Sequence, residues 1–100
     1  MITYRQPTVL DVPVLTSLER SMFPSYPWSQ AQFKEEITGL GRTRQFILAL
    51  NDGSIIGYAG IMVVAAGVPA DLLTIAILPD FRGQGLAQEM LAELENWAKA

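Results

Sequence analysis

The sequence contains no cysteine and no histidine. The lack of cysteine excludes disulfide bonds, a thiol nucleophile and a thiolate metal site, and it fits a cytoplasmic location. The lack of histidine excludes a Ser-His-Asp triad, an imidazole base and a zinc site with histidine ligands. We therefore expect no metal, and any proton transfer must use a carboxylate, a tyrosine, a lysine, a terminal amine or water.

Charge is also scarce, since 17% of the residues are charged and the formal net charge is -3. This balance argues against a general nucleic-acid or anionic-membrane binder, because either needs a basic patch. The longest apolar stretch, residues 55–66, is interrupted by Gly57 and Gly60 and is too short to span a bilayer. The N-terminus shows no targeting signal, so the expected location is cytoplasmic.

Apolar residues make up 50% of the 100 residues, which is enough for one packed core. We therefore expect one domain, or part of one, over residues 1–100. The patterns predict an α+β fold in which helices pack on a mostly antiparallel sheet. The expected elements begin with a strand at 2–5, a helix starting between Thr8 and Asp11 and a second helix from Ser29. Three strands follow at 44–50, 54–64 and 71–78, the last two joined by a loop at 65–70. A helix at 85–99 ends the sequence.

Local signals support several of these elements. Ser29 and Gln32 have the spacing of a capping box, in which a hydroxyl and an amide satisfy the first amides of a helix. Residues 51–53, Asn-Asp-Gly, predict a tight hairpin turn because they adopt positive φ easily. The two glycines of the following strand, at positions 57 and 60, indicate a bulge or a close backbone approach. The apolar run at residues 72–78 predicts a strand that is buried on both faces.

The most informative segment is residues 79–88, where a strand leads into a glycine-rich turn that opens a helix. The free amides at the positive end of a helix form an anion site that suits phosphate. Gly83 and Gly85 have no Cβ, so an oxygen can approach the main chain, and Arg82 can add a charged contact. A Walker lysine is missing, and Gln88 stands where a dinucleotide fingerprint needs its third glycine. An ordinary turn that uses glycine for its geometry, or another nucleotide site, stays an alternative.

Beyond these signals, residues 82–87, Arg-Gly-Gln-Gly-Leu-Ala, resemble the Arg/Gln-x-x-Gly-x-Gly/Ala signature of the GNAT acetyltransferases. Residues 73–81 resemble the core strand of that family and its exit. Residues 23–29, which include Pro-Trp-Ser, together with Phe33, are similar to the RimI branch, whose members acetylate a small-subunit ribosomal protein on its first alanine. The resemblance extends over residues 2–100.

The resemblance implies a GNAT fold and a direct transfer of acetyl from acetyl-CoA to a protein N-terminal amine in a ternary complex, with no metal. It implies that main-chain amides of the turn hold the pyrophosphate and that the core strand binds the pantetheine arm as an added strand. The Trp28 region would lie by the peptide entrance. The residues expected to bind acetyl-CoA are Ile75, Ala76, Ile77, Arg82, Gly83, Gln84, Gly85, Leu86, Ala87 and Gln88.

One departure from the family is large. GNAT acetyltransferases continue after the corresponding helix with a strand, a helix and two strands, and RimI-like members carry a glutamate and a tyrosine there. No counterpart of either occurs in this sequence, so we assign no catalytic residue. Glu89, Glu93 and Glu95 are expected on a solvated helix face, and Tyr58 is expected to be packed. The sequence is therefore interpreted as the N-terminal portion of one GNAT domain.

This departure predicts an exposed strand edge. Without the next strand, residues 72–78 would present unpaired backbone groups and apolar side chains, which favour self-association. If the 100 residues are the whole molecule, we expect weak acetyl-CoA binding, no normal catalysis, and dimers or aggregates. The alternative function is a non-catalytic GNAT-like module that self-associates through this edge.

Overall fold

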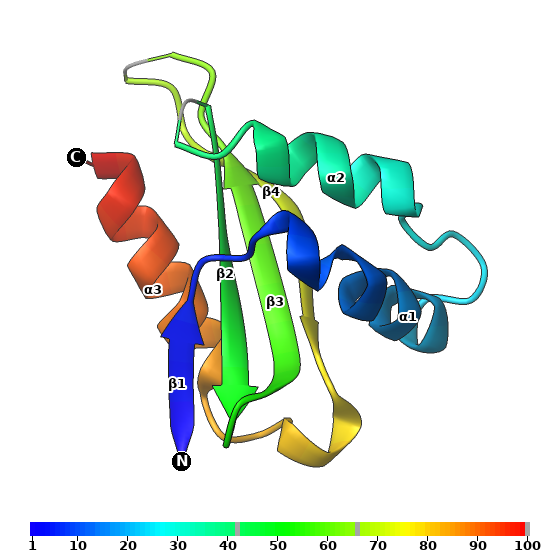
Figure 1. Ribbon diagram of the computed structural model, residues 1–100. Helices are drawn as coiled ribbons and strands as arrows, with labels where there is room; N and C mark the ends of the chain where they lie inside the picture. The colour runs from blue at the N-terminus through cyan, green and yellow to red at the C-terminus, as the bar shows by residue number, and fades with distance from the viewer. Residues whose placement is uncertain (42, 66, 100) are drawn as a thin grey trace.

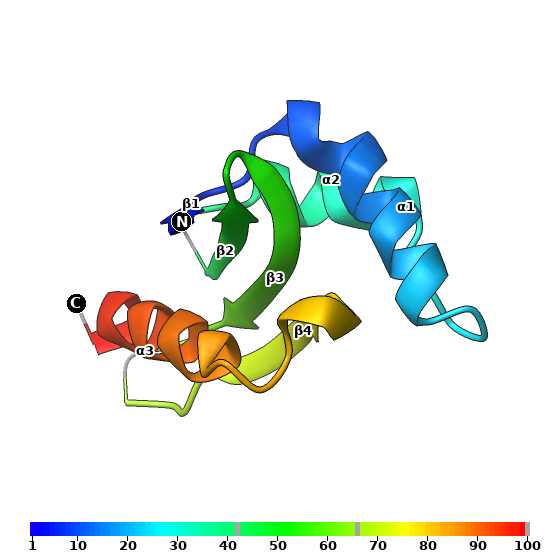
Figure 2. The same ribbon diagram turned by 90° about the horizontal axis from the view of Figure 1, so that it is seen from below.

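The computed structural model describes residues 1–41, 43–65 and 67–99. The strands form one antiparallel sheet in the order β1-β2-β3-β4, with bounds β1 (Ile2–Arg5), β2 (Arg44–Asn51), β3 (Ser54–Met62) and β4 (Asp71–Ile77). Helices α1 (Val12–Met22) and α2 (Gln30–Thr38) cover one face, and α3 (Leu86–Lys99) covers the other (Figure 1, Figure 2). Short 3-10 helices precede α1 (η1, Val9–Asp11) and α3 (η2, Pro79–Phe81). The predicted α+β class and the order of elements are confirmed.

The predicted capping box and hairpin are both present. Ser29 Oγ accepts a hydrogen bond from Gln32 N at 3.1 Å, and Ser29 N donates one to Gln32 Oε1 at 2.8 Å. In the turn between β2 and β3, Asp52 has φ 50° and Gly53 has φ 87°. These local bonds and dihedral angles fix where α2 begins and how β2 pairs with β3.

The glycines of β3 permit a close approach of neighbouring groups, as predicted. A Cβ at Gly60 would lie 2.4 Å from the ring of Phe46, and one at Gly57 would lie 2.9 Å from the main-chain oxygen of Ala76. The pairing between β3 and β4 also shifts in register between Gly60 and Ile61. Both positions therefore need glycine for packing, because no side chain fits there without displacing a strand or a ring.

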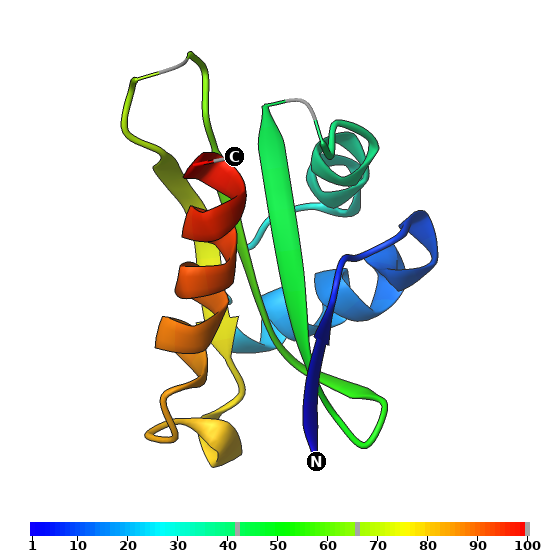
Figure 3. The same ribbon diagram turned by 90° about the vertical axis from the view of Figure 1, so that its left-hand side faces the viewer.

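The prediction that residues 72–78 are buried on both faces is wrong for most of the strand. β4 lies at the edge of the sheet, its Leu72 side chain is 53% exposed, and full burial is reached at Ala76 and Ile77. In Figure 3, α3 lies in front of the sheet and runs along β3 and β4. Leu94 and Trp97 near its end line a hollow together with residues of β1 and β2. β3 also ends at Met62 rather than at residue 64, and the predicted loop at 65–70 includes Ala66, which is outside the described residues.

The core has one half on each side of the sheet. On the α3 side, Leu86, Met90 and Leu94 pack against buried residues of β2 and β3. On the other side, Leu15 of α1 and Phe33 of α2 pack around Tyr58 of β3. Leu18 and Met22 of α1 and Trp97 of α3 are only partly buried against these two halves. Of the helices in the described part of the chain, none combines the length and the apolar composition that crossing a membrane requires.

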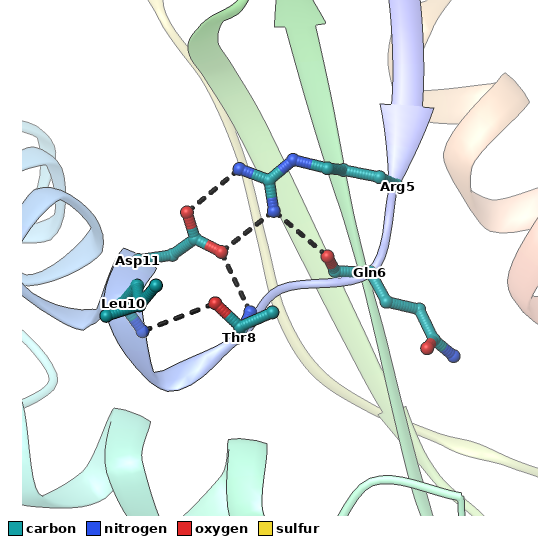
Figure 4. A network of polar contacts seen from close by, with 5 residues as sticks. All are labelled: Arg5, Gln6, Thr8, Leu10 and Asp11. Atoms are coloured by element: carbon teal, nitrogen blue, oxygen red, sulfur yellow. Dashed lines mark hydrogen bonds and ion pairs between the residues drawn. The ribbon is translucent and has the colours of Figure 1, made fainter.

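A polar network joins β1 to the helices that follow it (Figure 4). The Arg5 guanidinium donates to both carboxylate oxygens of Asp11, at 2.8 and 2.9 Å, and Asp11 Oδ2 also accepts from Thr8 N at 2.8 Å. Thr8 Oγ1 accepts from Leu10 N at 3.3 Å. The hydrogen bonds from Arg5 lower the pKa of Asp11 below its ordinary value, and the bond from Thr8 acts in the same direction. The network fixes the direction in which the chain enters α1.

Candidate functional site

A groove of about 720 Å³ lies where β4 passes through η2 into α3. It contains every residue that the sequence predicted for cofactor binding except Gln84. Phe23, at the C-terminal end of α1, and Phe81, in η2, contribute aromatic walls that the sequence did not point to. The groove is lined by Phe23, Ile75, Ala76, Ile77, Phe81, Arg82, Gly83, Gly85, Leu86, Ala87 and Gln88.

The turn before α3 leaves a series of main-chain amides free. The first hydrogen bond of the helix is donated by Glu89 N to Gly85 O at 3.1 Å. Among the described residues, none accepts a hydrogen bond from the amides of residues 83–88. Gly83 and Gly85 have φ of 81° and 80°, and a Cβ at either position would meet no atom within 4 Å. The N-terminus of α3 therefore presents open donors and a positive dipole to the groove.

Arg82 joins this turn to the end of β4. Its Nε donates a hydrogen bond of 2.9 Å to the main-chain oxygen of Ile77. Within the described parts of the chain, its terminal nitrogens form no ion pair with a carboxylate. The side chain thus braces the turn through one nitrogen, and its two terminal nitrogens have no carboxylate partner among the described residues.

The edge of β4 supplies further backbone groups. Leu78 N donates to Ile56 O of β3 at 2.8 Å, and Ala76 pairs with Tyr58 of the same strand. Because the direction of backbone groups alternates along an antiparallel strand, Ile77 and Ile75 direct theirs away from β3, to the open edge. The resemblance assigned Ile75, Ala76 and Ile77 to the pantetheine arm. Ala76 lines the groove, but its backbone groups face β3, so only Ile75 and Ile77 direct backbone groups to the open edge.

A second hollow of about 480 Å³ adjoins the groove and shares Phe23 and Ile75 with it. We call it the α1–β4 hollow. Trp28, which the resemblance placed by a peptide entrance, is part of its wall. Its remaining lining residues are Glu19, Pro24, Ser25, Tyr26 and Thr74.

Sequence reasoning missed Glu19, which is 3% exposed and faces this hollow. Its Oε1 accepts a hydrogen bond of 2.6 Å from the Tyr58 hydroxyl, and its Oε2 accepts one of 2.9 Å from Trp28 N. Burial raises the pKa of Tyr58, and the hydrogen bond to Glu19 raises it further. A signal was present, because position 19 follows Leu15 by four residues and so lies on the buried stripe of α1.

The other carboxylates lie elsewhere. Glu89, Glu93 and Glu95 are on the exposed side of α3, as predicted, and Tyr58 is fully packed, as predicted. Glu89 Oε2 accepts a hydrogen bond of 2.5 Å from the hydroxyl of Tyr4 in β1, and burial, followed by this bond, raises the pKa of Tyr4 to about 12. Over the described residues, no group of three or more acidic side chains is arranged to bind a metal ion.

The fold agrees with the family to which the sequence is matched. The profile described as "Acetyltransferase (GNAT) family" matches residues 12–100. The chain therefore belongs to the GNAT family of acetyltransferases.

Individual relatives carry related names. The chain is 28% identical over 95 residues to N-alpha-acetyltransferase RimI of Mycobacterium tuberculosis, an alignment that covers 92% of this chain and 59% of the relative. It is 31% identical over 80 residues to a Bacillus subtilis protein that carries the provisional name ribosomal protein bS18-alanine N-acetyltransferase, covering 80% of this chain and 50% of that protein. This chain thus spans between half and three fifths of the length of these relatives.

A solved structure shares the fold. The PaiA N-acetyltransferase of Thermoplasma acidophilum, crystallised in complex with coenzyme A, superposes with a TM-score of 0.84 at 20% identity. The match covers 99% of this chain and 72% of the other. It confirms the GNAT fold that the sequence predicted.

Proposed function

We propose that this chain forms the acetyl-CoA-binding part of an N-acetyltransferase that acts on protein N-terminal amines, as the RimI-named relatives indicate. The observation that carries the proposal is the groove at the start of α3, where unbonded amides and an open strand edge lie side by side. An ordinary glycine turn would satisfy its own amides or expose them to solvent, without a groove bordered by a free strand edge.

The groove fits a ligand with a diphosphate and an extended amide-containing arm. The amides of residues 83–88 and the terminal nitrogens of Arg82 would hold the phosphates, and each hydrogen bond to a charged oxygen contributes about 1.5–3 kcal/mol. The dipole of α3 adds roughly 0.3–1 kcal/mol, so the amides dominate. The edge N–H and C=O of Ile75 and the N–H of Ile77 would pair with the amides of the arm, since Ile77 O already accepts from Arg82 Nε.

Bound acetyl-CoA supplies an activated acetyl thioester as cosubstrate. In the transfer, the acceptor nitrogen forms a bond to the acetyl carbon, the carbon–sulfur bond breaks, the thiol of coenzyme A leaves and the nitrogen loses a proton. The residues of this chain bind and orient the two partners. We assign none of them as the acid or the base.

The test is a calorimetric titration of the chain with acetyl-CoA, compared with ATP and NAD. Gly85→Asp places a carboxylate in the proposed phosphate site, and we expect it to weaken acetyl-CoA binding by at least about a hundredfold. Gly53→Asp is the matched control, because Gly53 also has positive φ and open space around its Cβ but lies in the hairpin between β2 and β3 and does not line the groove. Equal affinities of the two variants, or tighter binding of ATP or NAD than of acetyl-CoA, would contradict the proposal.

The second candidate function is a non-catalytic module that assembles through β4. It is favoured by one observation, the exposed Leu72 on a strand whose outer edge is unpaired in the described part of the chain. A stable dimer that does not respond to acetyl-CoA in light scattering would support this function over the first.

A further inference from the structure

A third hollow, of about 460 Å³, lies between the end of β1, the first half of β2 and the last turns of α3. We call it the β2–α3 hollow, and its lining includes Tyr4, Gln45, Phe46, Glu93 and Trp97. It shares no lining residue with the groove or with the α1–β4 hollow. A ligand in this hollow would therefore be bound by residues that have no part in the proposed acetyl-CoA site.

The sheet has a gap in its strand pairing beside this hollow. β1 is four residues long and pairs with the part of β2 from Leu48 to Asn51. After β1 the chain leaves the sheet toward η1, as Figure 1 shows. At the other end of the gap, Arg44 O accepts a hydrogen bond of 3.0 Å from Gly41 N. Within the described part of the chain, residues 45–47 of β2 therefore lie on an open edge.

Phe46 directs its backbone groups to this open edge. Thr43 O accepts a hydrogen bond from Val63 N, so odd-numbered residues of β2 direct their backbone groups to β3 and Phe46 directs its own away from β3. The Phe46 ring packs on the face opposite to α3, with its centroid 6.0 Å from that of Trp28. Gln45 Oε1 accepts a bond of 3.3 Å from Phe46 N and so stands in for a neighbouring strand. An extended peptide that displaced the Gln45 amide would pair with Phe46 N and Phe46 O.

The wall of the hollow combines negative charge with aromatic surface. Glu93 takes part in none of the ion pairs of the described residues, and Trp97 follows it by one turn of α3. Tyr4 of β1 adds a second ring. Arg5 also lines the hollow, but both carboxylate oxygens of Asp11 accept hydrogen bonds from its guanidinium, so its charge is compensated. A carboxylate in one hollow with aromatic rings suits a guanidinium or ammonium group.

We infer that the β2–α3 hollow binds an extended, basic peptide segment of a partner protein. The segment adds to the open edge at Phe46 and places an arginine or lysine side chain beside Glu93 and Trp97. In this mode of recognition the main chain supplies affinity and the hollow selects the side chain. The formal net charge of -3 favours the approach of a basic partner. The segment needs no free N-terminus, so the site is distinct from one that binds an acceptor amine.

The probe is the peptide acetyl-threonyl-valyl-arginyl-valyl-threonine amide, whose blocked N-terminus cannot serve as an acceptor amine. One matched peptide has norleucine in place of arginine, and another carries N-methyl groups on both valines. Because side chains alternate along a strand, an arginine that points to the hollow puts a valine opposite Phe46. Each peptide is titrated into ¹⁵N-labelled protein in three forms: unmodified, Glu93→Gln and the control Glu95→Gln. Glu95 is an exposed glutamate of α3 that does not line the hollow.

We expect the arginine peptide to shift the Phe46 amide and the Trp97 indole signals of the unmodified protein, and to bind about tenfold more tightly than either matched peptide. Glu93→Gln should lose the preference for arginine over norleucine, and Glu95→Gln should retain it. The inference is overturned by equal affinity for any two of the peptides in the unmodified protein, by a retained preference in Glu93→Gln, or by absence of binding. Shifts that leave Phe46 and Trp97 unchanged overturn it as well. Should Glu93→Gln fail to fold, the three peptides and the unmodified protein decide.

Discussion

Arg82 Nε donates a hydrogen bond of 2.9 Å to the main-chain oxygen of Ile77, and this contact joins the glycine turn to the last residue of β4. The Arg82 side chain thereby holds the glycine turn, with its free amides, close to the open edge of β4. Its terminal nitrogens stay available to an anion. In the proposed complex, Arg82 therefore serves both the geometry of the site and its affinity.

Arg82→Ala is expected to weaken acetyl-CoA binding by about tenfold or more, because it removes a charged contact and loosens the turn. The control is Arg20→Ala, which removes an exposed arginine from α1. Calorimetric titration of both variants measures the effect. Unchanged acetyl-CoA affinity in a folded Arg82→Ala protein would show that Arg82 has no part in binding.

Tyr58→Phe is expected to lower the free energy of unfolding by about 1–3 kcal/mol at neutral pH, because Glu19 loses one of its two buried hydrogen bonds. Alkaline pH gives a second readout. The pKa of Tyr58 is raised in the folded state, so the unfolded chain loses the Tyr58 hydroxyl proton first, above about pH 10. The free energy of unfolding therefore falls there by about 1.4 kcal/mol per pH unit. Urea titrations from pH 7 to 11 should show a shallower decline in Tyr58→Phe. An equally steep decline in both proteins would contradict this explanation.

Asp11→Asn is expected to destabilise the protein at pH 7 by about 1 kcal/mol, because the amide cannot replace the carboxylate that caps η1 and pairs with Arg5. The pKa of Asp11 is lowered in the folded state, so its contribution is present above the unfolded value of about 3.9 and is lost as pH falls through the folded value. The difference in urea midpoint between the unmodified protein and Asp11→Asn should therefore shrink from pH 7 to pH 4 and pH 3. A constant difference over this range would contradict the assignment.

Leu72→Lys is expected to shift the chain toward monomer, because a charge on an edge strand opposes pairing with a second copy. Leu10→Lys is the control, since Leu10 is 86% exposed on η1, away from the sheet edge. Light scattering after size exclusion measures both. A dimer that persists in Leu72→Lys would place the association surface elsewhere.

Local signals made much of the fold predictable. The capping box at Ser29 and the turn at residues 51–53 depend on neighbours in sequence, so their physics is visible without tertiary structure. The burial of β4 was not predictable in this way. Leu72 and Ala76 belong to one apolar run, but Ala76 packs into the core cluster that α1 and α2 form on one face of the sheet, whereas Leu72 is 53% exposed near the start of the edge strand.

The residues of the site likewise include some that the sequence predicted and some that it did not. The groove residues around Gly83 and Gly85 were found because a glycine turn before a helix has a recognisable pattern. Glu19 was missed because its partners, Tyr58 and Trp28, are 39 and nine residues away in sequence. Even so, a glutamate among the apolar positions of α1 is a signal that a helical projection reveals.

The central claim is that the free amides at the start of α3 and the edge of β4 bind acetyl-CoA together. The most direct measurement is an amide-resolved nuclear magnetic resonance titration of the ¹⁵N-labelled chain with acetyl-CoA. We expect the largest shifts at the amides of residues 83–88, Ile75 and Ile77, with little change in the hairpin around Gly53. Binding that leaves these amides unshifted while others respond, or no response to acetyl-CoA anywhere in the spectrum, would contradict it.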